Sequence, residues 1–275
     1  MAAFPTRVTL GRSGLQVSKL GLGSSFKAPT SSYLEAFDQG VNYFYWGSIR
    51  REEMGSAIRE IASDRRDQLV VLLQSYSRLG FLLSTFVERG LRKLGLDQAD
   101  GLLLGWHNQM PSRDVLDAAL ELRERGLIRS IGLSTHRRSL LPTLVDNDAF
   151  EFWHVRYNAV HRGAERDVFP SLTERDVSSR PGMVTYTTTR WGNLCDPKKT
   201  PKGERTPTGT DCYRFALSHP QVDMCLAGPD NPEHMKQALT ALEQGPMDAV
   251  ELAWMRGVGD YIYSSSKSSG VMDGK

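Results

Sequence analysis

Apolar runs and amphipathic segments alternate along the chain with a period of roughly 30 residues, the length of one strand–helix unit. The apolar runs predict strands, and Leu69–Ser77 is apolar on both faces, which is typical of a buried parallel strand. The segments between them predict helices, such as Ser31–Gln39, Glu52–Ala62 and Arg113–Arg125, the last followed by a capping glycine. The expected strands are Lys19–Ser24, Val41–Trp46, Leu69–Ser77, Gly101–Asn108, Ile128–His136, Phe152–Asn158, Gly182–Thr189 and Val222–Gly228.

Eight such repeats indicate an α/β protein with the architecture of a (β/α)8 TIM barrel. A doubly wound sheet is the alternative, but the sequence has no Gly-x-Gly-x-x-Gly phosphate loop, and GLGSS after the first strand does not match its spacing. Two β-rich runs flank a Gly-Arg-Ser-Gly turn within Val8–Leu20 and predict an N-terminal β-hairpin at the bottom of the barrel. We expect residues 1–262 to form this single barrel domain and the polar residues 263–275 to form a flexible tail.

Charge and cysteine content narrow the range of functions. The 275-residue chain carries 34 Lys and Arg against 32 Asp and Glu, a formal charge of +2, so we expect no nucleic-acid partner. The three cysteines, Cys195, Cys212 and Cys225, are widely spaced, which indicates a reduced, cytoplasmic compartment. We expect no signal peptide and no membrane contact, because the N-terminus lacks an apolar segment and no apolar run reaches about 18 residues.

Polar and aromatic side chains gather where the expected strands end. The working residues of (β/α)8 barrels lie at these carboxyl ends and on the loops that follow. Neutral, aromatic and imidazole groups there suit the binding of a planar ligand, or general acid–base catalysis near pH 7. The end positions with such chemistry are Tyr45, Trp46, Gln74, Tyr76, Trp106, His107, Asn108, Ser134, Thr135, His136, Asn158, His161, Arg162, Tyr186, Thr187 and Arg190.

Each of these residues also has a purely structural interpretation. A histidine near a strand end often only completes a hydrogen bond, and aromatic residues fill a core. In Val41–Trp46, alternation places Tyr43 and Tyr45 on one face and Phe44 and Trp46 on the other, so one pair should pack under the helices. No His-x-His or His-x-x-x-His pair lies near these strands, so we expect no metal site.

Several stretches, in chain order, resemble the aldo-keto reductases. They are VTLGRSGLQVSKLGLGS, GVNYF, IRSIGLS, RYN and VTYTTT, and the resemblance extends over about residues 6–245. It implies a (β/α)8 barrel that binds NADP(H) extended across the strand ends and reduces carbonyl compounds. The family uses an Asp, a Tyr, a Lys and a His in catalysis, and its tyrosine donates the proton.

The catalytic positions of that family differ in this chain. By resemblance, its Asp, Tyr, Lys and His correspond to Tyr45, Arg50, Gln74 and Gly105. An isolated tyrosine, with a pKa of about 10, donates a proton poorly at neutral pH without a cationic neighbour. We therefore expect a rebuilt catalytic set, drawn from Tyr45, Gln74, Tyr76, His107 and His136.

The cofactor-binding positions agree better with the family. By resemblance, Ser134 and Thr135 correspond to the pair that holds the carboxamide, and Tyr186 to the tyrosine that stacks on the nicotinamide. Ala227–Met235 resembles the adenine-end loop, but it has no Lys or Arg for a 2′-phosphate, and His234 stands near the place of the family's arginine. The expected cofactor is NADP or NAD, bound by Ser134, Thr135, His154, Asn158, Tyr186, Thr187, Arg190 and Gly228.

Three functions remain open at this point. The first is an oxidoreductase that acts on a small carbonyl or related compound with a nicotinamide cofactor and a non-standard active site. The second is a non-redox lyase or isomerase that uses the histidines at the strand ends, and the third is a ligand-binding barrel without turnover. In each case the expected partner is a small molecule, and the protein is expected to be a monomer or a weak oligomer.

Overall fold

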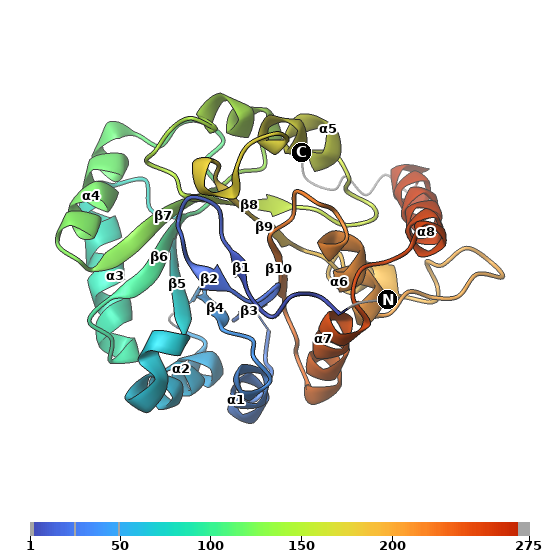
Figure 1. Ribbon diagram of the computed structural model, residues 1–275, viewed down its shortest axis with the longest axis horizontal. Coiled ribbons are helices and arrows are strands. Elements are labelled where there is room, and N and C mark those ends of the chain that lie inside the picture. Colours follow the sequence, from blue (N-terminus) through green and yellow to red (C-terminus); the bar gives the residue numbers. More distant parts are fainter. Residues whose placement is uncertain (1–2, 25, 49, 269–275) are drawn as a thin grey trace.

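The computed structural model of the protein describes residues 3–24, 26–48 and 50–268. These residues form a closed barrel of eight parallel strands, so the predicted (β/α)8 barrel is confirmed (Figure 1). Neighbouring strands pair in chain order, and β10 pairs with both β9 and β3 to close the ring. The strands are β3 (Leu20–Gly23), β4 (Tyr43–Trp46), β5 (Val70–Ser75), β6 (Ala99–Leu104), β7 (Ile128–Ser134), β8 (Phe152–Arg156), β9 (Gly182–Tyr186) and β10 (Met224–Ala227).

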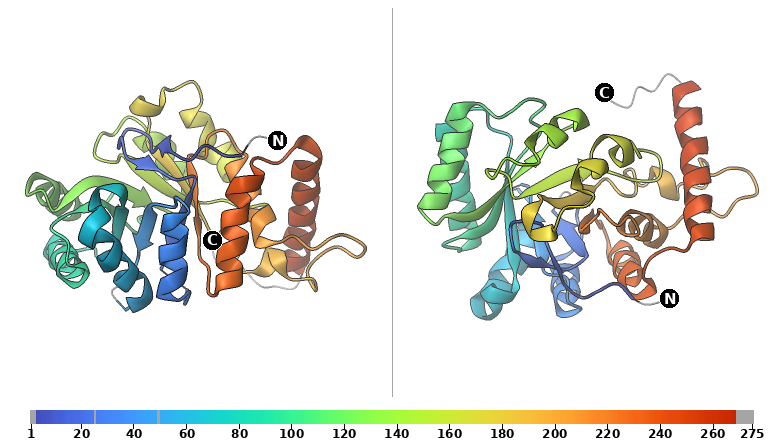
Figure 2. Two further views of the ribbon diagram at one scale, coloured as in Figure 1. Left: turned by 60° about the horizontal axis from the view of Figure 1, so that its bottom comes forward. Right: turned by 45° about the horizontal axis from the view of Figure 1, so that its top comes forward.

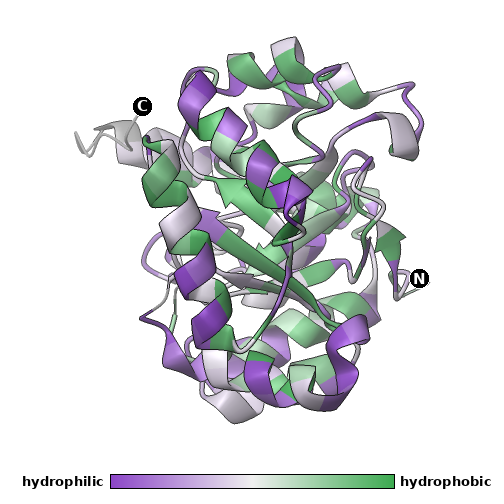
Figure 3. Cartoon of the chain, turned by 90° about the vertical axis from the view of Figure 1, so that its left-hand side faces the viewer, coloured by the Kyte–Doolittle hydropathy of each residue, from purple (hydrophilic) through white to green (hydrophobic). Residues whose placement is uncertain are grey.

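The strands carry apolar side chains on both faces, which creates two separate cores. Strand alternation predicted opposite faces for Tyr43 with Tyr45 and for Phe44 with Trp46, and this is confirmed. The two tyrosines belong to the cluster inside the barrel, whereas Phe44 and Trp46 pack in the layer beneath the helices. Figure 3 shows the apolar strands enclosed by helices whose outer faces are mostly hydrophilic. Consecutive residues of one strand therefore pack in different cores. The residues that point into the barrel continue along each strand up to the barrel mouth.

The predicted N-terminal hairpin is present and closes the amino end of the barrel. It consists of β1 (Val8–Thr9) and β2 (Gln16–Val17), which pair in antiparallel fashion. Leu10 and Leu15 of the hairpin join the apolar cluster inside the barrel. Gly11 bridges to the residue before β9 with φ of +50°, and a Cβ placed on it would lie 2.0 Å from the Gly182 nitrogen. Only glycine fits this close approach, so the turn is fixed against β9.

Long helices cover most of the strands, but two connections depart from the predicted strand–helix alternation. The chain passes from β7 to β8 through a 3-10 helix, Arg138–Leu144, which contains Pro142 and so lacks one backbone donor. From β8 to β9 it has only α5 (Ala164–Asp167) and short 3-10 turns. The other helices on the barrel are α1 (Thr30–Asp38), α2 (Glu52–Arg65), α3 (Gly80–Leu94), α4 (Arg113–Glu124), α6 (Gly209–Leu217) and α7 (Pro232–Gln244).

The C-terminal helix α8 (Ala249–Ser268) stands beside α6 at the side of the barrel (Figure 2). Arg256 on this helix pairs with Glu165 of α5 at 2.8 Å, which fixes α8 across the poorly helical β8–β9 connection. Residues 263–268, expected at the start of a flexible tail, continue this helix, and residues 269–275 lie outside the described residues. None of the helices in the described ranges is long and apolar enough to span a membrane.

Candidate functional site

A cavity of about 280 Å³ opens at the carboxyl ends of the strands. The structure brings most of the sequence-predicted side chains together around it, because all eight strands point their carboxyl ends to the same mouth. The predicted residues that line it are Tyr45, Gln74, Tyr76, Trp106, Ser134, His136, His154, Tyr186, Thr187 and Gly228.

His154 and Tyr45 form the floor of this cavity, and the buried Tyr43 contacts the histidine. The Tyr43 hydroxyl lies 2.9 Å from Nε2 of His154, and the Tyr45 ring lies 5.5 Å from the same imidazole. Burial lowers the pKa of His154 to about 3, so its ring is neutral at pH 7. Burial, followed by the neighbouring Tyr76 and Tyr186 hydroxyls, raises the pKa of Tyr45 well above its ordinary value. Tyr45 therefore keeps its proton and can donate a hydrogen bond, but it is a weaker acid than a free tyrosine.

Gln74 and Tyr76 occupy the space above Gly105, the position that matches the family's catalytic histidine by resemblance. A Cβ placed on Gly105 would lie 2.6 Å from the Gln74 Nε2 and 2.7 Å from the Tyr76 ring. These separations are below normal van der Waals contact, so the Gln74 amide and the Tyr76 ring would both have to shift to admit a Cβ at 105. Three positions around the cavity are thus sterically linked.

His107 does not line the cavity. Its Nε2 lies 3.1 Å from an Nη1 of Arg78, and because a guanidinium only donates, this imidazole nitrogen accepts. Burial and then the Arg78 charge lower the pKa of His107 to about 4. Arg78 also donates to the carbonyl oxygens of Tyr76 at 2.9 Å and Trp106 at 2.7 Å. Arg78 and His107 therefore hold together the loops after β5 and β6. The contacts of His107 stabilise these loops and do not face the cavity.

Three expected cofactor residues also lie outside the lining of the cavity and position its loops. Thr135 donates to Oδ1 of Asn108 at 3.2 Å, and Asn158 donates to the Thr187 carbonyl at 2.8 Å. Arg190 is buried and donates to the Ser266 hydroxyl at 3.2 Å, which ties the loop after β9 to α8. The bond from Asn158 secures Thr187 in a left-handed conformation with φ of +59°.

Sequence reasoning missed several residues that line the same cavity. Arg156 follows His154 by two residues on β8, so strand alternation alone could have placed it toward the mouth. Trp106, by contrast, was expected at the end of its strand and does line the cavity; it follows β6 in a left-handed conformation with φ of +56°, which ends the expected strand before it reaches Asn108. Phe26 and Trp191 come from loops, where no periodic signal exists. The remaining residues come from a helix and from the inner faces of strands, and they are Tyr213 of α6, Leu103 of β6 and Leu226 of β10.

A second cavity, of about 520 Å³, adjoins the first. It extends toward the N-termini of α6 and α7, where Gly209, Asp230 and His234 contribute to its lining. The His234 Nδ1 and an Asp230 carboxylate oxygen lie 2.5 Å apart. The two cavities share the lining residues Phe26, Thr189, Trp191, Tyr213 and Gly228, so they form one extended path across the barrel mouth.

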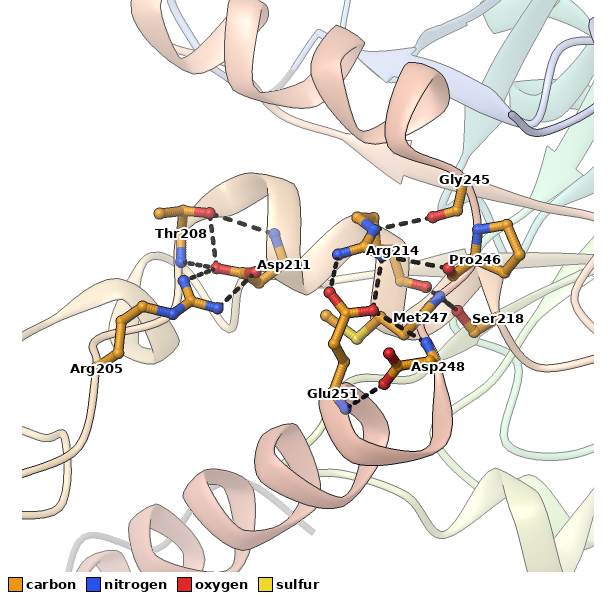
Figure 4. A network of polar contacts seen from close by, with 10 residues as sticks. All are labelled: Arg205, Thr208, Asp211, Arg214, Ser218, Gly245, Pro246, Met247, Asp248 and Glu251. Carbon is orange, nitrogen blue, oxygen red and sulfur yellow. Dashed lines mark hydrogen bonds and ion pairs between the residues drawn. The ribbon is translucent and has the colours of Figure 1, made fainter. Parts of the chain in front are cut away.

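The α6 wall of the second cavity is held by a polar network (Figure 4). Thr208 caps α6 reciprocally with Asp211, and Arg205 forms an ion pair with the same carboxylate at 2.8 Å. At the other end of α6, buried Arg214 makes two bonds to Glu251 of α8, at 2.6 and 2.8 Å. Such charge-assisted, bidentate bonds are among the stronger polar contacts in proteins, so the wall is well positioned for a ligand. In the described ranges no group of three His, Cys, Asp or Glu side chains could hold a metal ion.

Comparisons with known proteins agree with the resemblance. No protein-family model matches the sequence. The chain is 35% identical over 130 residues to 2,5-diketo-D-gluconic acid reductase B of Corynebacterium sp. (strain SHS752001), covering 46% of this chain and 44% of that protein. It is 29% identical over 151 residues to an aldo-keto reductase of Mycobacterium avium (strain 104), covering 53% of each. The match therefore spans about half the length of these curated relatives.

Solved structures extend the similarity to most of the fold. The holo form of an aldo-keto reductase from Bacillus halodurans superimposes with a TM-score of 0.76 at 19% identity, over 92% of this chain and 95% of that one. An aldo-keto reductase from Klebsiella pneumoniae in complex with NADPH gives 0.73 at 19% identity, over 94% and 95% of the two chains. The predicted resemblance is confirmed: the chain is related to the aldo-keto reductases by sequence over about half of its length and shares their fold over most of it.

Proposed function

We propose that the protein is an oxidoreductase of the aldo-keto reductase type that binds a nicotinamide dinucleotide and acts on a small carbonyl compound. The observation that carries the proposal is the extended path formed by the two adjoining cavities. It runs from the polar floor at His154 to the loop after β10 and the start of α7, so it offers room for a ligand that extends across the barrel mouth. The Klebsiella pneumoniae structure contains NADPH in the same fold.

The residues along this path fit a dinucleotide. In the described part of the chain, the buried Tyr186 hydroxyl and the buried Thr188 Oγ1 have no hydrogen-bond partner. Leaving such a group unsatisfied costs about 1–3 kcal/mol, a cost that a polar ligand would relieve. Tyr186, Ser134 and His154 would hold the nicotinamide end, and the Thr187 to Thr189 loop would hold the middle. Asp230 and His234 would lie at the adenine end.

The chemistry expected from this chain is slow reduction of a carbonyl. When bound, the nicotinamide supplies a hydride, and the protein must stabilise the carbonyl oxygen and provide a proton. Tyr45 lies in the lining and keeps its hydroxyl proton, so it is the donor we assign to that oxygen. Because its raised pKa lies far from neutral pH, we expect a general-acid contribution below the usual 10²- to 10⁴-fold, at about tenfold.

One observation favours a second candidate, a non-redox lyase or isomerase. His136 lies in the lining, and burial followed by the Arg156 charge lowers its pKa, so it is neutral at pH 7 and can accept a proton. A neutral imidazole in a cavity is a suitable general base. Substituting His136 by Gln would remove such an activity, whereas it would change hydride transfer only slightly.

Nicotinamide fluorescence tests the first candidate directly. Titrating the protein with NADPH and with NADH should give a saturable change with at least one of them, and Tyr186→Ala should weaken it. Turnover is then measured on a panel of aldehydes and ketones with wild type, Tyr45→Phe and His107→Ala. We expect Tyr45→Phe to lower kcat and His107→Ala to leave it near wild type. Absence of saturation with both cofactors would rule out the proposal.

A further inference from the structure

Arg156 is a cation in the lining of the first cavity. It lies at the carboxyl end of β8 and is only partly exposed. Among the described residues, no hydrogen-bond or ion-pair partner is found for its guanidinium. Arg138, which is also partly buried, is by contrast paired with Asp167 at 3.0 Å. A partly buried cation without a counterion is costly, and a bound anion would compensate it.

The rest of the cavity has the electrostatic character of an anion site. No Asp or Glu is present among the described lining residues. The lining imidazoles carry no charge at pH 7, because burial lowers the pKa of His154 to about 3 and also lowers that of His136. Arg156 is therefore the one formal charge among those lining residues, and the cavity is positive.

A second donor accompanies Arg156 on the neighbouring strand. Arg156 and Tyr186 are register partners across β8 and β9, and both line the cavity. The Tyr186 hydroxyl is buried and unpartnered within the described residues, as noted above. A carboxylate or phosphate oxygen can accept from both groups at once, since a guanidinium and a phenol are both donors.

Aromatic side chains surround the outer part of the same cavity. Tyr76, Trp106 and Trp191 all line it while remaining 51%, 53% and 59% exposed. The Trp106 ring lies 5.2 Å from that of Tyr76 and 5.3 Å from that of His136. Exposed aromatic groups beside a cavity favour an apolar or planar ligand body. The expected ligand thus combines an anionic group with an aromatic or apolar part.

We infer that Arg156 and Tyr186 form a binding site for an anionic oxygen group, and that the aromatic residues at the mouth hold the apolar part of the same ligand. The anionic group comes from one of two sources, a substrate carboxylate or the pyrophosphate of the dinucleotide. The role in turnover rests on the proposed function, but binding of the anion is measurable without any cofactor.

Tryptophan fluorescence provides the test, because Trp106 and Trp191 lie beside the site. The intact protein is titrated with phenylacetate and with the uncharged 2-phenylethanol, and separately with NADPH and NADH. Wild type should bind phenylacetate at least about tenfold more tightly than the alcohol, a ratio typical of one charge-assisted contact. Arg156→Gln should abolish that ratio, and Arg156→Lys should retain part of it. Arg89→Gln is the matched control, since it removes an exposed arginine on α3, away from the cavity.

The outcomes separate the two sources. Loss of phenylacetate binding in Arg156→Gln, with dinucleotide affinity unchanged, assigns the site to a substrate carboxylate. Loss of about tenfold or more in dinucleotide affinity, with phenylacetate unaffected, assigns it to the pyrophosphate. If Arg156→Gln behaves like Arg89→Gln with all four ligands, the inference is wrong. If neither dinucleotide binds but phenylacetate binding still depends on Arg156, the proposed function fails and the anion site stands.

Discussion

The second cavity predicts that this protein discriminates weakly between NADPH and NADH. The two cofactors differ by a 2′-phosphate, which proteins usually bind with an Arg or Lys. No Lys or Arg is found among the described residues that line this cavity, and Asp230 contributes a carboxylate. One charge-assisted phosphate contact is worth about 1.5–3 kcal/mol, or roughly 10- to 150-fold in affinity. Without it, we expect the two dissociation constants to agree within about tenfold.

Substitutions at the same place should change this ratio in a defined order. The Asp230 and His234 side chains are 50% and 53% exposed, so solvent screens their charges and single effects are small. Asp230→Asn removes a like charge and should tighten NADPH by about two- to fivefold. His234→Arg adds the missing cation, but Asp230 would partly neutralise it, so the double variant should show the largest gain, about tenfold or more. NADH affinity should stay within about twofold throughout.

Nicotinamide fluorescence titrations at fixed ionic strength measure these constants. Glu233→Gln is the control, because it removes one negative charge from the first turn of α7 without touching the lining of the cavity. A wild-type preference for NADPH of more than about 100-fold would contradict the reasoning, since no described residue of the cavity supplies that much energy. Equal changes of NADPH affinity in Asp230→Asn and Glu233→Gln would show that the change comes from long-range electrostatics and not from a contact in the cavity.

Three further predictions test the catalytic end, the barrel closure and the buried histidine. Gln74→Lys alone should not produce ordinary aldehyde reduction, because Tyr45 and Gly105 also differ from the family; robust NADPH oxidation with an aldehyde by this variant would contradict the alignment. Gly11→Ala should lower the free energy of unfolding in urea by about 3 kcal/mol, since its Cβ would meet the Gly182 backbone at 2.0 Å, whereas Gly14→Ala, with φ of +68° and open space around it, should cost about 1 kcal/mol. His154 has a folded-state pKa of about 3, below its unfolded value, so the unfolded chain binds the proton first and stability is lost as pH falls from about 6.5 toward 3. His154→Gln should therefore flatten the pH dependence of unfolding in that window by up to about 1.4 kcal/mol per pH unit, and an unchanged slope would refute the burial argument.

Much of the barrel can be predicted from residue patterns, because each strand–helix unit repeats the same alternation of buried and exposed side chains. Strand alternation predicted that Tyr43 and Tyr45 face one side and Trp46 the other, and the structure agrees and places the tyrosines inside the barrel. The same rule brought Tyr45, His154 and Tyr186 to one mouth. The rule also covers Arg156, which shares the face of His154, so the signal for that residue was present in the sequence.

The parts that could not be predicted depend on contacts between loops. The sequence shows a histidine two residues after Gly105, but not that the chain turns at Trp106 with φ of +56° and leaves His107 against Arg78. Phe26 and Trp191 reach the cavity from irregular segments, and no periodicity assigns their direction. The second cavity likewise depends on how the loop before α6 meets α7, which is a tertiary property.

Steric linkage around Gly105 couples positions 74, 76 and 105, two of which match catalytic positions of the aldo-keto reductases by resemblance. A side chain at position 105 would overlap both Gln74 and Tyr76, because its Cβ would lie 2.6 Å from the Gln74 Nε2 and 2.7 Å from the Tyr76 ring. A histidine could return to 105 only if both neighbours moved or were replaced, so single reversions are opposed by packing as well as by chemistry. Ser134 ends the neighbouring strand β7, and its hydroxyl accepts from the Trp106 amide at 3.1 Å, whereas Tyr186 lies on β9, three strands from β6 around the barrel. The packing therefore favours joint changes at positions 74, 76 and 105 over any single reversion.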